Sequence, residues 1–454
     1  MEEVKQYFFD LDFEKSDSSL QKISDQSQNA YLNIYQSFIQ NIVAHSISFD
    51  EYASVFNHDI DLLKENNYSK LYNLYLLSEL YLQRGIIEYQ NEHSFRAISY
   101  FTKAYSYWKD CEGADVGNHY NLKLSGIFNL LIGNLPNPYS QMAGWVGFSG
   151  DTKKGFVDLE KYLQLQSDHH GDYMEALIYL GFSYLKFAKD ESQIEKFIQN
   201  NSSTDLPELI QSLMLRCANK IHQPLLCLNI LKSKSDFPIL IYLQGKYMVQ
   251  SLSDTAEPIL KQFLKLEKSN QFKADAFRYL SWHYLLNGDT IRYQQYQDSI
   301  LVMDDYPTSE DKQAKFENDL NVIPDLSLLK ARLLFDKGAY EIASTVLLSV
   351  RENINSTENL IEYHYRLGRC FQYLNNENKA LYHFKACVDL GKDSKRYFAP
   401  YSALYATKIF LHQKSISDAK LYFQKAEELN NGEYNYSIKQ ELAELKNLCW
   451  GEGE

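Results

Sequence analysis

Two histidines and two aspartates near position 170 are the residues most suggestive of metal chemistry. Asp168, His169, His170 and Asp172 are all of types that bind transition metals. They lie within one short turn, where successive side chains diverge, and no second ligand pair stands at the i, i+4 spacing of a helical site. We interpret them as a polar loop and predict no metal site.

A glycine-rich segment at residues 141–165 is the second candidate for chemistry. Its glycines are Gly144, Gly147, Gly150 and Gly155, close to Trp145 and Phe148. A phosphate-binding loop of the Walker type needs Lys and then Ser or Thr after its last glycine, whereas Phe156 and Val157 follow here. No buried strand precedes the segment either. We interpret it as a structural crossover between helical hairpins, with Asp151 placed to cap the helix that follows.

Catalytic groups are not evident elsewhere. His364 and His383 could approach each other on paired helices, but His364 occupies a packing position, which favours a structural role. No Gly-x-Ser-x-Gly elbow occurs, and no cysteine has a plausible histidine partner. No carboxylate is set in the apolar surroundings that a catalytic acid needs. The sequence therefore predicts neither an enzyme nor a cofactor.

A repeated pattern between Ile361 and Glu427 indicates which elements build the protein. The copies share small and aromatic residues at matching offsets: Leu367, Gly368, Phe371, Ala380, Phe384 and Cys387, then Ala406, Phe410, Ala419, Phe423 and Ala426. They start about 39 residues apart, within the ~34–47-residue periods of helical arrays. Small residues allow two helices to cross closely, and aromatic residues fill the wider gaps between hairpins. Fainter copies at 75–105, 239–265, 274–297 and 330–350 extend the pattern, which predicts an all-α solenoid of helical hairpins.

This pattern resembles the tetratricopeptide repeat, in which the same positions carry the small and aromatic packing residues. A narrower resemblance joins NLLIGNLP and VGFSGDTKKGFVDLEKYL, within Ser125–Leu165, to the inclusion body clearance protein and its tetratricopeptide-39 relatives. FPILIYLQGKYMVQS at Phe237–Ser251 resembles the next helix of that family, and Bacteroidetes-type repeat proteins share the layout. The family's tryptophan-rich later stretch is missing apart from Trp282. The resemblance implies an all-α repeat scaffold without catalytic activity.

The first helix of each hairpin lines the inner face of such an array, where a partner would bind. The residues predicted to face inward are Glu362, Tyr365, Arg369, Gln372 and Tyr373 in one repeat and Tyr401, Lys408 and His412 in the next. Arg369 and Lys408 occupy equivalent positions, so we expect them to share one concave surface and to bind an acidic or C-terminal peptide group. The favoured function is therefore a non-catalytic scaffold that binds a protein or peptide. The alternative is a structural subunit of a larger stable assembly.

Composition narrows the choice of partner. The chain of 454 residues carries a formal net charge of −13, and its Lys/Arg residues form no dense cluster, which argues against nucleic acid as a partner. Nothing approaches ~18 consecutive apolar residues, so no transmembrane segment is expected. Its six cysteines form no CxxC pair, and Cys370 and Cys387 fall at packing positions between helices, where we expect free buried thiols.

The sequence also suggests a location and a division of the chain. The acidic start, Met1–Asp10, has no signal-peptide form and indicates a cytoplasmic protein; the alternative is a periplasmic or exported protein trimmed of its signal. We expect an N-terminal helical region at 1–170, middle hairpins at 171–303, an acidic linker at 304–325, and a C-terminal array with a capping helix at 326–454.

Overall fold

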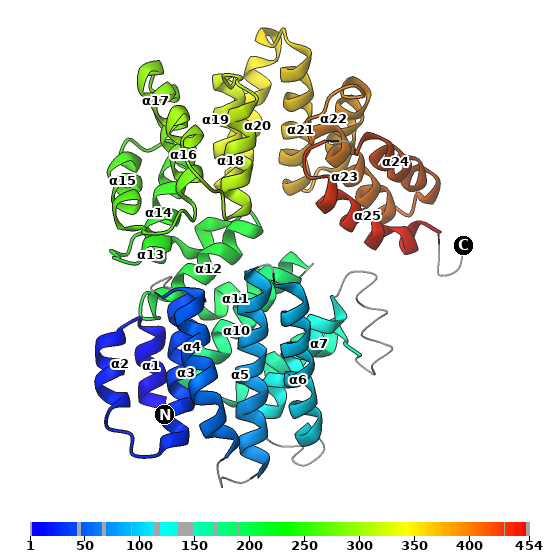
Figure 1. Cartoon of the computed structure of the whole chain (residues 1–454). Helices are drawn as coiled ribbons and strands as arrows, with labels where there is room; N and C mark the ends of the chain where they lie inside the picture. The colour runs from blue at the N-terminus through cyan, green and yellow to red at the C-terminus, as the bar shows by residue number, and fades with distance from the viewer. Residues whose placement is uncertain are drawn as a thin grey trace. The chain divides into compact units, whose positions relative to one another are not determined.

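The computed structural model describes residues 2–42, 47–65, 70–91, 93–112, 119–134, 149–166, 171–188, 190–430 and 432–450. Within these residues it contains 24 α-helices and no β-strand (Figure 1). Many consecutive helices pack against each other as hairpins, which confirms the predicted all-α fold of helical hairpins. The chain divides into two compact units, Met1–Ile221 with Leu226–Leu243, and His222–Leu225 with Gln244–Glu454.

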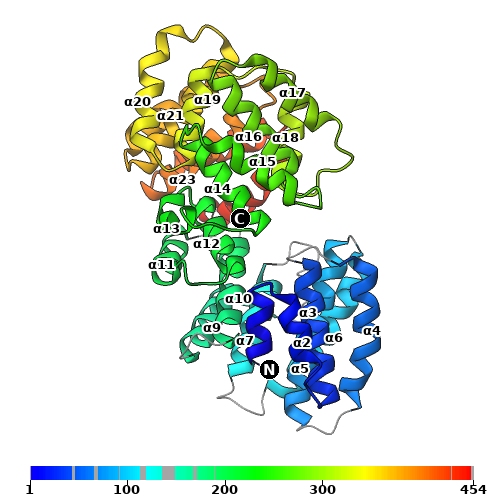
Figure 2. The same cartoon turned by 90° about the vertical axis from the view of Figure 1, so that its left-hand side faces the viewer.

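The first unit begins with a short hairpin and continues as a row of longer ones. Its helices are α1 (Glu2–Phe9), α2 (Phe13–Leu20), α3 (Gln26–Ile42), α4 (Phe49–Lys64), α5 (Lys70–Gln90), α6 (Ser94–Glu112), α7 (His119–Gly133), α9 (Thr152–Leu165), α10 (Gly171–Phe187), α11 (Glu191–Asn201), α12 (Glu208–Lys220) and α13 (Leu228–Leu231). Helices α3 to α6 stand side by side in both views (Figures 1 and 2). Helix α1 packs against α10, far along the chain, as well as against its neighbours α2 and α3.

A buried charge cluster joins the helices of the first unit. Lys5 on α1 and Lys123 on α7 lie 3.2 and 3.1 Å from the two carboxylate oxygens of Glu175 on α10. Lys123 also lies 2.9 Å from Glu79 on α5. Tyr35 donates a further hydrogen bond to Glu175. Burial alone would raise the pKa of Glu175, but Lys123, Lys5 and these hydrogen bonds hold it well below its usual range.

The second unit consists mainly of hairpins that follow one another. Its helices are α15 (Ala256–Leu266), α16 (Lys273–Leu286), α17 (Thr290–Leu301), α18 (Ser309–Asp319), α19 (Leu326–Asp336), α20 (Tyr340–Val350), α21 (Thr357–Tyr373), α22 (Glu377–Leu390), α23 (Phe398–His412), α24 (Ile416–Leu429) and α25 (Asn435–Trp450). Helix α14 (Pro238–Gln250) contains the boundary between the two units.

One turn geometry recurs in four hairpins of the second unit. The residue in the left-handed conformation is Gly288, Gly338, Asn375 or Lys414, with φ of 79°, 91°, 55° and 59°. In each hairpin the next backbone N–H donates to a carbonyl in the last turn of the preceding helix, as Asn376 does to Phe371. This pattern of hydrogen bonds satisfies carbonyls that the end of a helix leaves open. Four hairpins are therefore joined in the same way.

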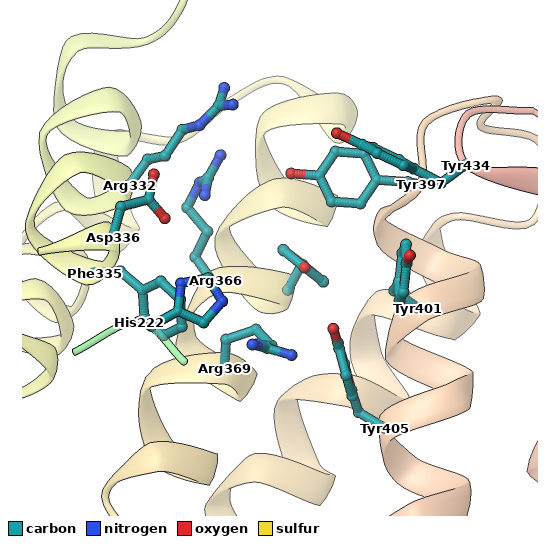
Figure 3. Close-up of a pocket in the computed structure, with 11 residues that line it drawn as sticks. His222, Arg332, Phe335, Asp336, Arg366, Arg369, Tyr397, Tyr401, Tyr405 and Tyr434 are labelled. Atoms are coloured by element: carbon teal, nitrogen blue, oxygen red, sulfur yellow. The ribbon is translucent and has the colours of Figure 1, made fainter. Parts of the chain in front are cut away.

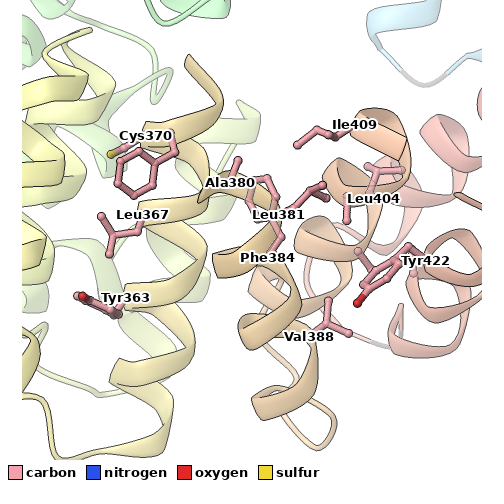
Figure 4. Close-up of a cluster of buried hydrophobic side chains, with 14 of the residues drawn as sticks. Tyr363, Leu367, Cys370, Ala380, Leu381, Phe384, Val388, Leu404, Ile409 and Tyr422 are labelled. Carbon is pink, nitrogen blue, oxygen red and sulfur yellow. The ribbon is translucent and has the colours of Figure 1, made fainter. Parts of the chain in front are cut away.

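The packing predicted from the repeat is confirmed. Ala380 and Ala419 have no exposed surface, and a Cβ added at Gly368 would lie 2.5 Å from two ring carbons of Phe384. The core of the array runs from α19 to α25, and Figure 4 shows Phe384 and neighbouring side chains filling the space between helices. The capping helix predicted at the end of the array is α25, which packs against α23 and α24. All six cysteines are free and buried, as predicted for Cys370 and Cys387.

The stretch 304–325, predicted to be an acidic linker, is partly helical. It contains α18, whose Ala314 is fully buried with Ala274 and Ile300. Thr308 and Asp311 form a capping box, and Asp311 also accepts a hydrogen bond of 2.8 Å from the backbone N–H of Phe272. The acidic residues that suggested a linker therefore serve helix capping in part. The boundaries drawn at 170 and 303 stay predictions.

The glycine-rich segment is described only from residue 149 onward. Asp151 caps α9 as predicted, because its side chain accepts from the backbone N–H groups of Lys153 and Lys154. A Cβ at Gly155 would lie 2.6 Å from the side chain of Leu130, so this glycine allows α9 to cross α7 closely. The interpretations placed on Gly144, Trp145, Gly147 and Phe148 and on Asp168, His169 and His170 lie outside the described residues. Among the described helices, none is both long and apolar enough to cross a membrane.

Candidate functional site

Three successive first helices of the second unit surround a cavity of about 220 Å³. We call it the arginine–tyrosine cavity. Its lining residues are His222, Arg332, Phe335, Asp336, Tyr365, Arg366, Arg369, Tyr397, Tyr401, Tyr405 and Tyr434. Figure 3 shows the arginines, from α19 and α21, opposite the tyrosines of α23 and the segments that precede α23 and α25. Side chains three or four positions apart share one face of a helix, which explains the spacing of Arg366 and Arg369.

The arginine side of the cavity is held in place by groups around it. Arg332 donates from Nη1 and Nη2 to the two oxygens of Glu317, at 3.1 and 2.9 Å. Arg366 donates from Nε to Glu362 over 2.6 Å. The guanidinium carbon of Arg369 lies 4.1 Å from the ring centroid of Tyr405, a close cation–π contact. The three guanidinium groups are therefore fixed before any ligand binds.

The tyrosine side consists of rings in mutual contact. The rings of Tyr401 and Tyr405 are stacked, with centroids 5.7 Å apart, and Tyr397 meets Tyr434 edge-on at 5.2 Å. Tyr397, Tyr401 and Tyr405 recur at four-residue steps and so project from one side of the chain. Burial raises the pKa of all four phenols, so they remain neutral hydrogen-bond donors at neutral pH.

Three other titratable groups belong to the lining: His222, Asp336 and Tyr365, and burial raises the pKa of Tyr365 as it does for the other tyrosines. Burial, with Arg369 and Lys246 nearby, lowers the pKa of His222 to about 3, so its imidazole is neutral at physiological pH. His222 is fixed by a hydrogen bond of 2.7 Å from the hydroxyl of Tyr340 to its backbone carbonyl. Burial raises the pKa of Asp336, while neighbouring cations, Arg332 first among them, oppose that rise. Among its side chains, the cavity thus presents three permanent cations and one carboxyl group.

A second, more open pocket of about 620 Å³ lies along the turn between α21 and α22 and the end of α23. We call it the polar groove. Its lining residues are Gln372, Asn375, Asn376, Glu377, Asn378, Lys408, Ile409, His412 and Gln413. Lys408 lies 2.6 Å from Glu441 on α25, and His412 lies 2.7 Å from Glu377. Lys408 and His412 therefore both face carboxylates of the protein.

The residues predicted from the sequence fall into separate places. Tyr365, Arg369 and Tyr401 line the arginine–tyrosine cavity, whereas Gln372, Lys408 and His412 line the polar groove. Glu362 supports Arg366 from outside the lining, and the ring of Tyr373 stacks on Tyr340 with centroids 4.7 Å apart.

That Arg369 and Lys408 share one ligand stays a prediction. Equivalent repeat positions place both residues on first helices. They line different pockets, but both cations lie near the ring of Tyr405, with Arg369 at 4.1 Å and Lys408 at 5.7 Å from its centroid. Arg369 stacks on Tyr405, while Lys408 turns to Glu441 of the capping helix.

The sequence did not predict several residues that line the arginine–tyrosine cavity. Arg366 lies three positions before Arg369, and Tyr397 and Tyr405 flank Tyr401 at four-residue steps, so helical periodicity could have found them. To predict that Arg332 lines the cavity, the register of the preceding hairpin would have to be known. His222 comes from a short segment more than a hundred positions away, and no local pattern indicates that it belongs here.

The pair of histidines predicted to meet does so outside the cavity. The Nδ1 atoms of His364 and His383 lie 3.0 Å apart. Burial lowers the pKa of both rings to about 4, aided by Arg351 at His364 and by His364 and Lys379 at His383. Among the described residues, no group of three or more metal-binding side chains surrounds them or any other point. The contact is that of two neutral rings, one of which donates to the other.

Comparisons with known proteins add little to this description. No family model matches the chain, and no curated protein matches its sequence. Among solved structures, the crystal structure of the P58(IPK) TPR domain is similar to it, with 15% sequence identity over 91% of this chain and 98% of that one, at a TM-score of 0.23. A TM-score of this size means that the two backbones do not superpose as whole chains.

Proposed function

We propose that this protein is a non-catalytic scaffold whose second unit binds a peptide or partner protein, with an acidic group of the partner held in the arginine–tyrosine cavity. The observation that carries the proposal is the cavity itself, in which three fixed arginines face four tyrosines in an otherwise acidic chain. Arginines and tyrosines are enriched at binding hot spots, because they combine large contact area with directed hydrogen bonds.

The lining groups suit binding better than catalysis. Guanidinium groups stay protonated at any physiological pH, so they do not transfer protons. The phenols stay protonated as well, because burial raises the pKa of each. The narrower kinship with the inclusion body clearance and tetratricopeptide-39 proteins belongs to this proposal, and it rests on the motif at residues 125–165.

Selection of peptides tests this function. The full chain is used to select from a displayed peptide library, and the affinities of selected peptides are then measured by calorimetry for wild type, Arg369→Gln and Tyr401→Phe. We expect acidic peptides to be selected and to lose at least about tenfold in affinity in Arg369→Gln, since a charge-assisted hydrogen bond is lost. Lys425→Gln, on α24 and outside the lining, is the matched control. Selection of no peptide, or equal affinity in all variants, would refute the proposal.

One observation favours the alternative of a structural subunit. Val302, Val322, Ile323 and Leu326 are at least half exposed around the ends of α17 and the start of α19. Exposed apolar side chains of this kind are often buried against a fixed partner. Native mass measurement in lysate separates the two functions: a large stable complex supports the subunit, and a monomer supports the transient binder.

A further inference from the structure

We propose that the arginine–tyrosine cavity receives a phosphate monoester carried on a side chain of the bound partner. This inference rests on the proposed function and specifies the ligand of the same site. It goes beyond an acidic group in general, because it prefers a phosphorylated side chain to a carboxylate. Charge, donor number and size each favour that choice.

Charge is the first argument. The lining holds Arg332, Arg366 and Arg369 against the single carboxyl group of Asp336, and the imidazole of His222 is neutral. Within the lining the arginines outnumber the carboxyl group, although Glu317 and Glu362 pair with two of them from behind, so the cavity favours an anion and a doubly charged anion over a singly charged one. A phosphate monoester carries about −1.5 to −2 at pH 7, more negative charge than a carboxylate.

The carboxylates behind the arginines leave donors for a ligand. Glu317 accepts from two nitrogens of Arg332, and Glu362 pairs with Nε and Nη2 of Arg366. A guanidinium group has five N–H donors, so both arginines keep N–H groups that these carboxylates do not occupy. The two carboxylates also reduce the repulsion among the arginines, which would otherwise oppose a preformed site.

The number and placement of donors is the second argument. Guanidinium groups stand on one side of the cavity and the phenols of Tyr397, Tyr401 and Tyr405 on the other (Figure 3). A carboxylate has two oxygens, which one bidentate arginine satisfies. A phosphate monoester has three terminal oxygens, which accept from several donors arranged around them. Donors on two opposite sides therefore suit the tetrahedral group better than the planar one.

Size is the third argument. The cavity of about 220 Å³ is smaller than the ~300–1,000 Å³ of pockets that enclose a whole small-molecule ligand. It has room for one substituent, such as a phosphorylated side chain, while the rest of the ligand lies outside. The rings that line it, Phe335 and the tyrosines, can contact the carbon atoms of that side chain. A peptide source is therefore favoured over a free phosphorylated compound.

Replacing Asp336 tests the inference, because the expected change in affinity has the opposite sign to the change that a damaged fold would cause. Its carboxyl group lies in the same lining as the arginines, so an anionic ligand is repelled when Asp336 is ionised. Asp336→Asn removes that charge with little change in shape, and we expect it to strengthen phosphate binding. Damage to the fold would weaken binding instead.

The experiment compares degenerate peptide libraries that differ only at one fixed position. The fixed residue is phosphotyrosine, phosphoserine, glutamate, tyrosine or serine, and binding to the full chain is measured by fluorescence anisotropy. We expect a phosphorylated library to bind at least about tenfold more tightly than the glutamate library. Arg369→Gln should abolish that preference, Tyr401→Phe should reduce it while it retains the ring, and Asp336→Asn should increase affinity. Lys425→Gln should leave binding unchanged.

Each contrary outcome has its own meaning. If acidic peptides bind at the cavity but phosphate adds nothing, the inference fails and the proposed function stands. Inorganic phosphate and phenyl phosphate are measured in parallel. If they bind as tightly as any phosphopeptide, the source is a free phosphate compound and the peptide part of the inference is overturned. If none of these probes binds, or if Asp336→Asn and Arg369→Gln both leave affinity unchanged, the cavity is not a phosphate site.

Discussion

Replacing Glu175 by Gln should destabilise the first unit strongly. The carboxylate of Glu175 has no exposed surface and lies within 3.2 Å of the ammonium groups of both Lys5 and Lys123. The variant keeps the shape but leaves two buried cations with less compensating charge. Removing one partner of a buried ion pair costs about 3–5 kcal/mol in the free energy of unfolding. For a domain of 150–250 residues each kcal/mol shifts Tm by ~2–4 °C, so the first unit should melt roughly 6–20 °C lower.

Thermal and urea denaturation followed by circular dichroism measure this loss, and hydrogen exchange of α1 and α10 localises it. Glu112→Gln is the control, because the Glu112–Lys109 pair is partly exposed and should contribute less than about 1 kcal/mol. Lys123→Met combined with Glu175→Gln should cost less than the sum of the single changes, since it removes a cation together with its counter-charge. A melting temperature unchanged in Glu175→Gln would refute the role of the cluster.

The sign of the pH dependence follows from the same contacts. The pKa of Glu175 is lower in the folded chain than in the unfolded one, so its stabilisation is fully present above the ordinary carboxyl pKa. It is lost as pH falls from that value toward the folded pKa. The difference between wild type and Glu175→Gln should therefore narrow below about pH 4.5. A difference that stays constant down to pH 3 would mean that charge is not its source.

Two further predictions concern the second unit. Gly368→Ala should lower the free energy of unfolding by about 1–3 kcal/mol through the clash with Phe384, less the ~1 kcal/mol that alanine gains in a helix. Adding Phe384→Leu should recover part of this loss. If the effects of the two changes on the free energy of unfolding, measured by denaturation, are purely additive, Phe384 is not the obstacle. The pKa values of His364 and His383 are lowered to about 4 in the fold, so stability should decline as pH falls from about 6.5 toward 4 while the unfolded chain takes up protons. His383→Gln should flatten that decline in urea titrations, and an unchanged slope would count against the pair as its source.

Sequence periodicity predicted the C-terminal array well because small residues at helix crossings have few alternatives. Gly368 must lack a side chain to admit Phe384, and Ala380 and Ala419 are fully buried. Such constraints leave a signal in the sequence itself. In the acidic stretch at 304–325, composition did not reveal that Asp311 serves as a buried capping group of α18.

The binding site was less accessible to sequence reasoning for a different reason. A repeat determines where each backbone position lies, but the orientation of a long side chain depends on the residue that its end group contacts. Glu441 draws Lys408 toward α25, and Tyr405 holds Arg369 over the cavity. Neither partner belongs to the repeat frame of the residue it orients. His222 lines the cavity although it is distant in sequence from the other lining residues, and the periodicity of the sequence does not indicate such a contact.

The two units differ in when each can fold during synthesis. Each hairpin of the second unit forms between consecutive helices, such as α21 and α22, so a short stretch of chain is enough to complete it. In the first unit, Lys5 on α1 meets Glu175 on α10, a separation of 170 residues. Until α10 has left the ribosome, α1 lacks the buried carboxylate that matches its lysine. Because non-local contacts slow folding and expose apolar surface in the meantime, we expect the nascent first unit to bind chaperones until α10 has been synthesised.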